Sequence, residues 1–267
     1  MTESQDISQV AFEPAELIEK LLAIGTALSG VYELEELLSL ILTKSREITY
    51  SDAGSVYLVH PNHAEPSLLF KVAQNSSKPT LSFQEFTMPM TPKSLAGYVA
   101  LTGETLNLPD AYHLPSHVPY QLDRSFDQGI LYRTRSVLVL PMQNQQGETI
   151  GVLQLINRKI APDIVVTPDN ALDVTQTYSA WEERIVRSLA SQAAISIERN
   201  HLQESIEQLF EGFVKASVQI IEARDPCTSG HSERVADLTV RLSEEASSLT
   251  HGTLASIYFS DRQLQEI

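Results

Sequence analysis

Residues 136–158 read Ser-Val-Leu-Val-Leu-Pro-Met-Gln-Asn-Gln-Gln-Gly-Glu-Thr-Ile-Gly-Val-Leu-Gln-Leu-Ile-Asn-Arg. Apolar residues dominate 136–142 and 149–157, and the residues between them, 144–147, are polar and end in glycine. Apolar runs of this length bounded by turn residues are typical of strands, and a short polar connection with glycine is typical of a hairpin. The stretch therefore predicts two antiparallel strands that belong to one sheet.

The upstream part of the chain adds three shorter apolar runs, each bounded by Pro, Asn or Ser: residues 54–59, 67–72 and 81–86. They predict a meander, which together with the hairpin gives a five- or six-stranded antiparallel sheet. Apolar residues at helical spacing predict flanking helices, so the expected fold class is α+β. The expected helices cover residues 13–30, 34–42, 94–101 and 179–223, and long irregular segments cover 108–128 and 158–178.

Composition excludes several classes of protein. The 267 residues include 19 Lys and Arg against 34 Asp and Glu, a formal charge of −15, which disfavours nucleic acid and anionic membrane surfaces as partners. No apolar run approaches the roughly 18 residues of a membrane span, and the acidic start of the chain does not resemble a signal peptide. A single cysteine, Cys227, fits a reducing compartment, so we expect a cytoplasmic protein.

The second half of the long helix over 179–223 carries an apolar seam whose members alternate in steps of four and three. That spacing is typical of a coiled coil, and a parallel homodimer is the natural partner for it. The alternative is one helix that packs on its own domain, as we expect for its earlier part around Ile185, Leu189 and Ala193. The seam consists of Leu202, Ile206, Leu209, Phe213, Ala216, Ile220 and Ala223.

Four phrases of the sequence, residues 95–104, 106–112, 132–136 and 150–158, together with the order of elements, resemble a GAF domain over about residues 13–200. They are most similar to GAF domains of cyclic-nucleotide phosphodiesterases and bacterial adenylyl cyclases. Those domains often carry an Asn-Lys…Phe…Asp-Glu signature, for which this chain offers Asn157, Arg158, Tyr178, Glu182 and Glu183. The resemblance implies an ion pair between Arg158 and Glu182 that ties the end of a strand to the exit helix.

The same resemblance implies a ligand pocket with Ser55 and Thr134 on its wall and Phe126 and Asp127 as its lid. Ile130 stands where nucleotide-binding relatives tend to have a hydroxyl residue. Three alternatives remain open: a cyclic nucleotide, another small ligand, or a domain that only dimerises. A covalently bound bilin is not expected, because it needs a cysteine inside the domain and Cys227 lies beyond it.

Residues 224–235, Arg-Asp-Pro-Cys-Thr-Ser-Gly-His-Ser-Glu-Arg-Val, predict a break and a new helix, because proline ends one helix and Thr228 or Ser229 can cap the next. The run resembles the start of HD-GYP phosphohydrolase domains, in which His231 is a metal ligand. The resemblance implies a parent protein that hydrolyses cyclic di-GMP with a pair of divalent metal ions, iron or manganese. We expect residues 225–267 to hold only the first helices of that domain, without the His-Asp pair, and therefore to lack activity and cofactor.

The leading hypothesis is a dimeric sensory module of a bacterial signalling phosphodiesterase: a tail over 1–12, the GAF domain over 13–200, a coiled-coil helix over 201–224 and the helical extension over 225–267. The alternative is a module that dimerises and binds proteins without a small ligand. A free-standing hydrolase is disfavoured, because no pair of nucleophile and base stands out. The spacings of His60, His63, His113 and His117 match no metal motif.

Overall fold

The computed structural model describes residues 25, 33–60, 66–81, 83–222, 230–249, 251–252, 255–260 and 263–264. The chain divides into two compact units, residues 1–201 and 202–267. The tail expected over 1–12, nearly all of the helix expected over 13–30, and Cys227 lie outside the described residues.

One antiparallel sheet forms the centre of the first unit, with the strand order β3-β2-β1-β6-β5-β4 and a short β7 paired to β6. The first three strands form the predicted meander, and the α+β fold class is confirmed. The sheet has seven strands rather than five or six, because no strand was predicted at 106–108, where β4 lies, or within the segment 158–178, which contains β7. The strands are β1 (Ser51–His60), β2 (Ser67–Asn75), β3 (Phe86–Pro89), β4 (Leu106–Leu108), β5 (Val137–Gln143), β6 (Thr149–Lys159) and β7 (Thr175–Gln176).

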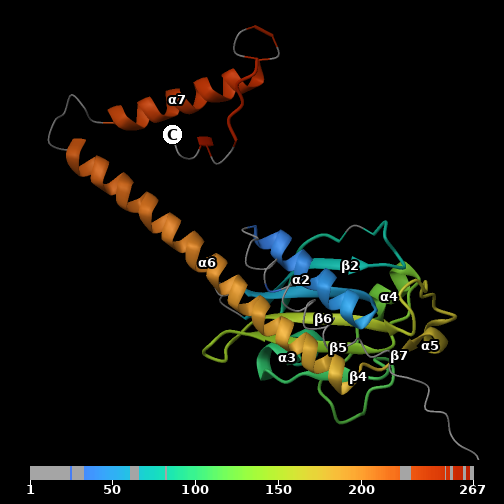
Figure 1. Cartoon of the computed structure of the whole chain (residues 1–267). Helices are drawn as coiled ribbons and strands as arrows, with labels where there is room; N and C mark the ends of the chain where they lie inside the picture. Colours follow the sequence, from blue (N-terminus) through green and yellow to red (C-terminus); the bar gives the residue numbers. More distant parts are fainter. Residues whose placement is uncertain are drawn as a thin grey trace, which may run out of the picture. The chain divides into compact units, whose positions relative to one another are not determined.

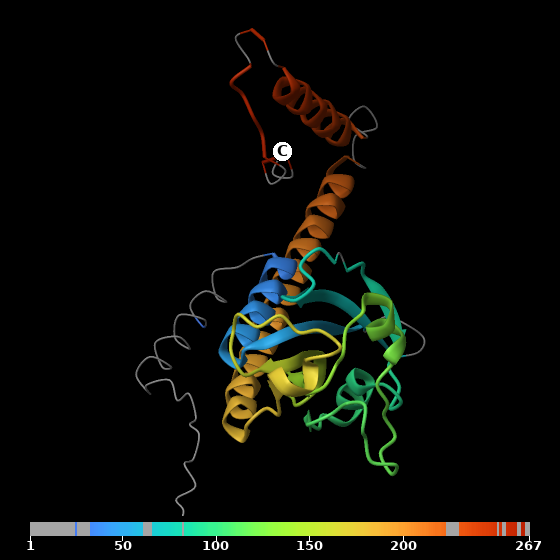
Figure 2. The same cartoon turned by 90° about the vertical axis from the view of Figure 1, so that its right-hand side faces the viewer.

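The predicted hairpin of β5 and β6 lies inside the sheet, and alternate side chains enter cores on its two faces. Leu138, Leu140, Leu153 and Leu155 belong to the larger core, which they share with helices α2 (Leu34–Thr49) and α6 (Ala180–Glu222). Both helices cover the same face of the sheet (Figures 1 and 2). Burying each large aliphatic side chain stabilises the fold by about 1.5–3 kcal/mol, so this layer supplies much of the stability.

The opposite face of the sheet is covered by α3 (Leu95–Thr102) and by α4 (Arg124–Ile130) with the segments around it. The hydroxyl of Ser94 accepts a hydrogen bond from the backbone N–H of Gly97 and caps α3, and Gly103 ends it with a φ of 69°, a conformation that glycine adopts without strain. Side chains of β1, β2, β5 and β6 meet α3 in this second core, which includes Val137, Val139 and Val152.

Sequence reasoning misplaced β3 and missed four other short elements: β4, α4, α5 and β7. The strand predicted over 81–86 is found at Phe86–Pro89, because the ring of Phe83 stacks on Phe126 while Leu81 N–H closes a turn on Lys78. The irregular segments 108–128 and 158–178 contain most of α4 and all of α5 (Ala171–Val174) and β7. Each is too short for a periodic pattern to reveal it.

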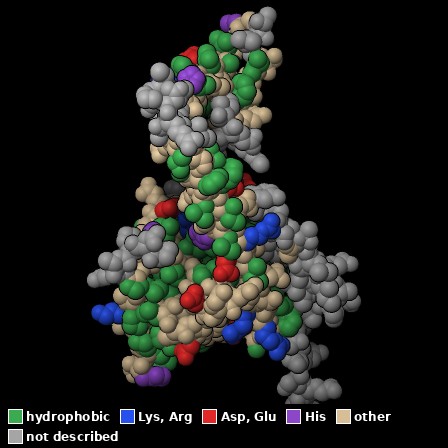
Figure 3. All heavy atoms as spheres, turned by 90° about the vertical axis from the view of Figure 1, so that its left-hand side faces the viewer, with side chains coloured by type: hydrophobic (Ala, Val, Ile, Leu, Met, Phe, Trp, Pro, Cys, Tyr) green, Lys and Arg blue, Asp and Glu red, His purple; other side chains and the backbone are tan. Residues whose placement is uncertain are grey.

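Helix α6 is continuous over 43 residues, as the pattern over 179–223 predicted. The side chains of the seam are exposed in the second unit: Leu202, Ile206, Leu209, Phe213 and Ile220 have exposed fractions of 61–74%. Figure 3 shows hydrophobic side chains gathered along this part of the helix. Ala223 lies outside the described residues. Within the same unit, α7 (His231–Ser248) follows Gly230, whose φ is 66°.

A search of the described residues finds no helix that combines the length and the apolar character needed to cross a bilayer.

Candidate functional site

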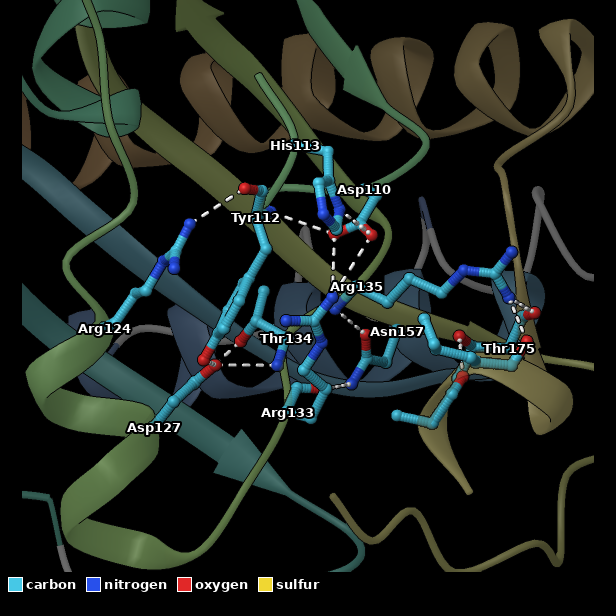
Figure 4. Close-up of polar contacts among 12 residues, drawn as sticks. Asp110, Tyr112, His113, Arg124, Asp127, Arg133, Thr134, Arg135, Asn157 and Thr175 are labelled. Atoms are coloured by element: carbon cyan, nitrogen blue, oxygen red, sulfur yellow. Dashed lines mark hydrogen bonds and ion pairs between the residues drawn. The ribbon is translucent and has the colours of Figure 1, made fainter. Parts of the chain in front are cut away.

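A buried carboxylate on α4, that of Asp127, organises the candidate site (Figure 4). The residue is 3% exposed, and both of its carboxylate oxygens accept hydrogen bonds. Thr134 donates from its backbone N–H at 2.7 Å and from its hydroxyl at 2.9 Å, and the hydroxyl of Tyr112 donates at 2.9 Å. A buried charge needs such partners, so Asp127 fixes Thr134 and Tyr112 in place.

The ring of Tyr112 lies between two guanidinium groups. The Arg133 guanidinium carbon is 3.6 Å from the ring centroid and that of Arg124 is 4.3 Å away, and Figure 4 shows them on opposite sides of the ring. Arg124 also donates to the backbone oxygen of Tyr112 at 2.8 Å. Burial, followed by the hydrogen bond to Asp127, raises the pKa of the Tyr112 hydroxyl, so the neutral donor form is maintained.

Asp110 neutralises one of the two arginines. Its carboxylate accepts from Arg133 at 3.1 and 3.2 Å and lies 2.8 Å from Nδ1 of His113. Burial acts to raise the pKa of Asp110, but the hydrogen bonds from His113 and Tyr112 N–H and the charge of Arg133 together lower it. Within the described part of the chain, Arg124 has no carboxylate within ion-pair distance, so its positive charge remains uncompensated.

Asn157 at the end of β6 holds the segment that carries Arg133 and Thr134. It is fully buried with a positive φ of 56°, which asparagine tolerates better than most residues. Its Oδ1 accepts from the backbone N–H of Arg135 at 2.7 Å, and its Nδ2 donates to the backbone oxygen of Arg133 at 2.8 Å. The asparagine of the signature therefore has a structural role: it fixes the backbone on both sides of Thr134.

The structure brings only some of the predicted ligand residues together. Asp127 and Thr134 are directly bonded. Phe126 is 52% exposed and stacks on Phe83 with ring centroids 6.0 Å apart, so it lies at the surface beside the buried cluster. Ser55 is buried on β1, opposite Gln154 of β6 and beside Tyr57, and no hydrogen bond joins it to Asp127 or Thr134 among the described residues.

The remaining residues of the signature join β6 to the start of α6. Arg158 Nε donates to Glu182 Oε1 at 2.6 Å, which is the ion pair expected from the sequence. Glu182 Oε2 accepts from the backbone N–H of Ser179 at 2.8 Å, and the Ser179 hydroxyl accepts from Glu182 N–H at 3.2 Å. This reciprocal pair is a capping box, which the spacing Ser-x-x-Glu could have predicted.

The other two signature residues also contact this junction. Asn107 of β4 donates to the backbone oxygen of Tyr178 at 3.1 Å and to Glu183 Oε2 at 3.2 Å. Burial is the main cause that raises the pKa of the Tyr178 hydroxyl, which is bonded to Ser51 at 2.8 Å. The start of α6 is therefore attached to β1, β4 and β6 at once.

Comparison with known proteins identifies the domain: residues 33–197 match the GAF domain family. The chain belongs to the GAF domain family. The GAF match lies within residues 13–200, the extent expected from the sequence, and stops before residue 225, so it lends no support to an HD-GYP domain.

Two curated relatives are phosphodiesterases. The chain is 34% identical over 136 residues to dual 3',5'-cyclic-AMP and -GMP phosphodiesterase 11A of Takifugu rubripes, with 48% of this chain and 14% of that protein covered. It is 28% identical over 180 residues to dual 3',5'-cyclic-AMP and -GMP phosphodiesterase 11 of Drosophila melanogaster, with 64% and 11% covered. The matched part is thus a small fraction of either relative.

Solved structures share the GAF fold. The GAF domain of a phosphoenolpyruvate-protein phosphotransferase from Coxiella burnetii aligns with a TM-score of 0.52 at 21% identity, covering 71% of this chain and 96% of that one. The chromophore-binding domain of a bacteriophytochrome from R. palustris aligns with a TM-score of 0.53 at 12% identity, covering 73% and 64%. At these identities the likeness extends to the fold alone.

The histidines do not form a metal site in the described part of this GAF-containing chain, where no group of three or more His, Cys, Asp or Glu residues could hold an ion. His113 contacts Asp110, and His117 is exposed in the same segment. His231 is the first residue of α7 and is exposed, while His63 lies outside the described residues.

Sequence reasoning did not assign a role to Tyr112, Arg124, Arg133 or Asp110. Asp110, Tyr112 and Arg124 come from the segment 108–128, which was expected to be irregular, and Arg133 follows α4; only the folded chain brings them to Asp127. The one local signal was Asp123, whose side chain accepts from Ser125 N–H at 2.9 Å and caps α4. Aspartate is a common helix N-cap, so Asp123 could have indicated the start of α4.

Proposed function

We propose that this GAF domain is a regulatory module that binds a small ligand beside α4, with a cyclic nucleotide as the first candidate. The observation that carries the proposal is the cluster around Asp127, where a buried carboxylate, the hydroxyls of Thr134 and Tyr112 and the guanidinium of Arg124 come together. Among the described residues, the carboxylates lie beyond ion-pair distance of Arg124. Carboxylate and hydroxyl groups suit the polar edge of a base or a ribose, and a guanidinium suits a phosphate.

The two phosphodiesterase relatives support this choice of ligand, because their names describe enzymes that act on cyclic AMP and cyclic GMP. The aromatic pair of Phe83 and Phe126 supports it as well, since an exposed aromatic face can stack on a planar base. Ile130 is a departure: it packs against the small core of Tyr132, Val166 and Ala171 and offers no hydroxyl.

Isothermal titration of the protein with cyclic AMP and with cyclic GMP tests the proposal. We expect saturable heat with at least one of them, and a loss of affinity in Asp127→Asn, because the amide cannot accept on both sides and so no longer holds both Thr134 and Tyr112 in place. Asp169→Asn changes the same charge at an exposed loop position and should bind as the wild type does. No heat with either nucleotide would leave the module without this ligand and favour a role in dimerisation alone.

The regulatory part of the proposal rests on α6. The exposed apolar seam from Leu202 to Ile220 lies on a continuous helix that begins at the capped junction with β6. We propose that a second copy of the chain covers this seam in a parallel coiled coil, so that α6 transmits ligand binding to whatever follows it. Each large apolar side chain buried there would stabilise the dimer by about 1.5–3 kcal/mol.

A matched pair of substitutions tests the dimer. Leu209→Lys places a charge in the seam and should shift the mass in light scattering from dimer to monomer. Gln208→Lys adds the same charge at the neighbouring exposed position and should remain dimeric. A wild-type protein that is monomeric at every concentration measured would refute the seam as a dimer contact.

A second function is favoured by the run from Arg224 to Val235, which resembles the start of an HD-GYP domain and places His231 on the first turn of α7. We propose that the natural full-length protein hydrolyses cyclic di-GMP with two divalent metal ions, and that His231 binds one of them. The test is hydrolysis of cyclic di-GMP by that protein with Mn²⁺, which should be lost in His231→Ala and kept in His251→Ala. Absence of turnover in the wild type would reject this function and leave the GAF proposal intact.

A further inference from the structure

Two adjacent buried residues at the start of β1, Ser51 and Asp52, bind the hydroxyls of two tyrosines that are far away in the sequence. The Ser51 hydroxyl lies 2.8 Å from the hydroxyl of Tyr178, and Asp52 Oδ2 accepts from the hydroxyl of Tyr132 at 2.7 Å. Ser51 is 4% exposed and Asp52 is fully buried. Successive side chains of a strand point to opposite faces, and the two tyrosines accordingly belong to different cores.

Tyr132 belongs to the α4 side of the domain. It directly follows Leu131, which ends α4 with a positive φ of 51°, and its backbone N–H donates to the backbone oxygen of Asp127 at 2.9 Å. Two residues later, Thr134 donates twice to the Asp127 carboxylate. Asp52 therefore holds the same short segment that forms the candidate ligand site.

Tyr178 belongs to the α6 side. It precedes the capping residue Ser179 of α6, and its side chain is 3% exposed in the core shared by α2, α6 and the sheet. The Ser51 hydroxyl that it contacts also lies 2.6 Å from the hydroxyl of Thr49, which in turn donates to Ser45 O at 2.8 Å. The hydroxyl of Tyr178 is thus held by a chain of buried hydrogen bonds at the end of α2.

Further contacts fix Asp52 in place. Its Oδ1 accepts from Ser77 at 2.7 Å and lies 3.4 Å from the buried Lys159 ammonium, and its backbone oxygen accepts from Arg46 at 2.7 Å. With every oxygen engaged, Asp52 has little freedom to move independently of its neighbours. Burial is the main cause that raises the pKa of both Tyr132 and Tyr178, so both remain neutral donors around pH 7.

We propose that Ser51 and Asp52 together form a positioning link, through which the segment that ends α4 determines how the first turn of α6 is held. The link joins the two sites because adjacent backbone units of one buried strand cannot shift separately. It rests on the proposed function only in treating the α4 side as the ligand side. No residue of the link contacts a ligand in this proposal.

A double-mutant cycle measures the link without any ligand. Tyr132→Phe, Tyr178→Phe and the double variant each keep the rings and remove only hydroxyls, and urea unfolding of these three and of the wild type gives the four equilibrium constants of the cycle. Independent sites give nearly multiplicative changes, whereas residues in one network couple. We expect the double variant to differ from the product of the singles by more than about threefold. A smaller difference would overturn the link.

A control cycle tests whether the coupling is specific to the link, and a replacement variant is available if one of the variants does not fold. Tyr120 is buried in the core that contains α3 and has no hydrogen bond to the link, so Tyr132→Phe with Tyr120→Phe should be multiplicative within about threefold. Coupling of the same size in this control would also overturn the proposal. If Tyr178→Phe fails to fold, Ser51→Ala replaces it in the cycle, because it removes the same contact from the other partner.

Hydrogen exchange supplies a readout that loss of stability alone would not reproduce. The backbone N–H of Glu183 donates to Ser179 O at 3.0 Å in the first turn of α6. We expect Tyr132→Phe to speed the exchange of this amide by about tenfold in conditions where local opening dominates, and Tyr120→Phe to leave it unchanged. Equal exchange in both variants would contradict the link, while a failed nucleotide titration would not bear on it.

Discussion

Asn157→Ala should be one of the most damaging single substitutions in the GAF domain, although Asn157 is a polar residue. The change leaves the N–H of Arg135 and the C=O of Arg133 without their side-chain partner in a fully buried position. Each such group costs about 1–3 kcal/mol. Alanine also has to adopt the φ of 56°, which costs it roughly 1 kcal/mol more than asparagine.

These contributions sum to about 3–7 kcal/mol, so we expect the free energy of unfolding to fall by at least about 3 kcal/mol, at the upper end of what point substitutions cause. Asn157→Gly separates the two causes, because glycine accepts the positive φ but also lacks the amide. Because glycine avoids the strain but loses the same two hydrogen bonds, we expect this variant to be slightly more stable than the alanine variant, although glycine's greater entropy in the unfolded chain offsets part of that gain.

Urea unfolding followed by circular dichroism measures all three proteins under the same conditions. Two results would refute the reasoning. An alanine variant within about 1 kcal/mol of the wild type would mean that the two backbone groups find other partners. A glycine variant less stable than the alanine variant would mean that the strain at the positive φ is smaller than the entropic cost of glycine in the unfolded chain.

Three further predictions concern charges and hydroxyls. In urea unfolding, Arg158→Ala should lower the free energy of unfolding by about 2 kcal/mol, which is less than the roughly 3–5 kcal/mol of a fully buried pair because the arginine is one-fifth exposed. Arg158→Lys should lose less than the alanine variant but remain less stable than the wild type, because an ammonium does not reproduce the geometry of a guanidinium. The pKa of Asp110 is lowered in the folded state, so its carboxylate stabilises the fold above pH 3.8, the ordinary pKa of the side chain, and this contribution is lost as the pH falls further. Asp110→Asn should therefore make the unfolding midpoint depend less on pH in the acid range. Because the pKa of Tyr178 is raised in the folded state, its contribution to stability is complete below pH 10 and is lost as the pH rises further. The free energy of unfolding of Tyr178→Phe should therefore fall less between pH 8 and higher pH than that of the wild type. An equal dependence on pH in both proteins would contradict this.

The strands with long apolar runs could be predicted from the sequence because their pattern is local. Residues 136–142 and 149–157 correspond closely to β5 and β6, and the helical spacing over 179–223 corresponds to α6. By contrast, α4 is seven residues long and contains Gly129, and contacts made by Asp127 with residues distant from the helix stabilise it. No local pattern encodes such contacts, so the segment looked irregular.

In the candidate site, too, some residues could be predicted from the sequence and others depend on long-range contacts. Asp127 and Thr134 could be found through a family resemblance, which carries positions from one sequence to another. Tyr112 and its two arginines could not, since their roles depend on the stacking of a ring between side chains of separate segments. The ion pair of Arg158 with Glu182 was expected from the sequence, but the use of both Glu182 oxygens, one for the cap and one for Arg158, needed the structure.

Asp127 is 3% exposed and already accepts three hydrogen bonds from the protein's own donors. Because the carboxylate is buried, a ligand that donates to it has to displace Thr134 or Tyr112, so its affinity would report the difference between two sets of hydrogen bonds rather than the strength of one. Such an exchange would release Tyr112 from between the arginines or loosen the turn after α4. Weak binding accompanied by a large rearrangement would therefore be the natural behaviour of this domain.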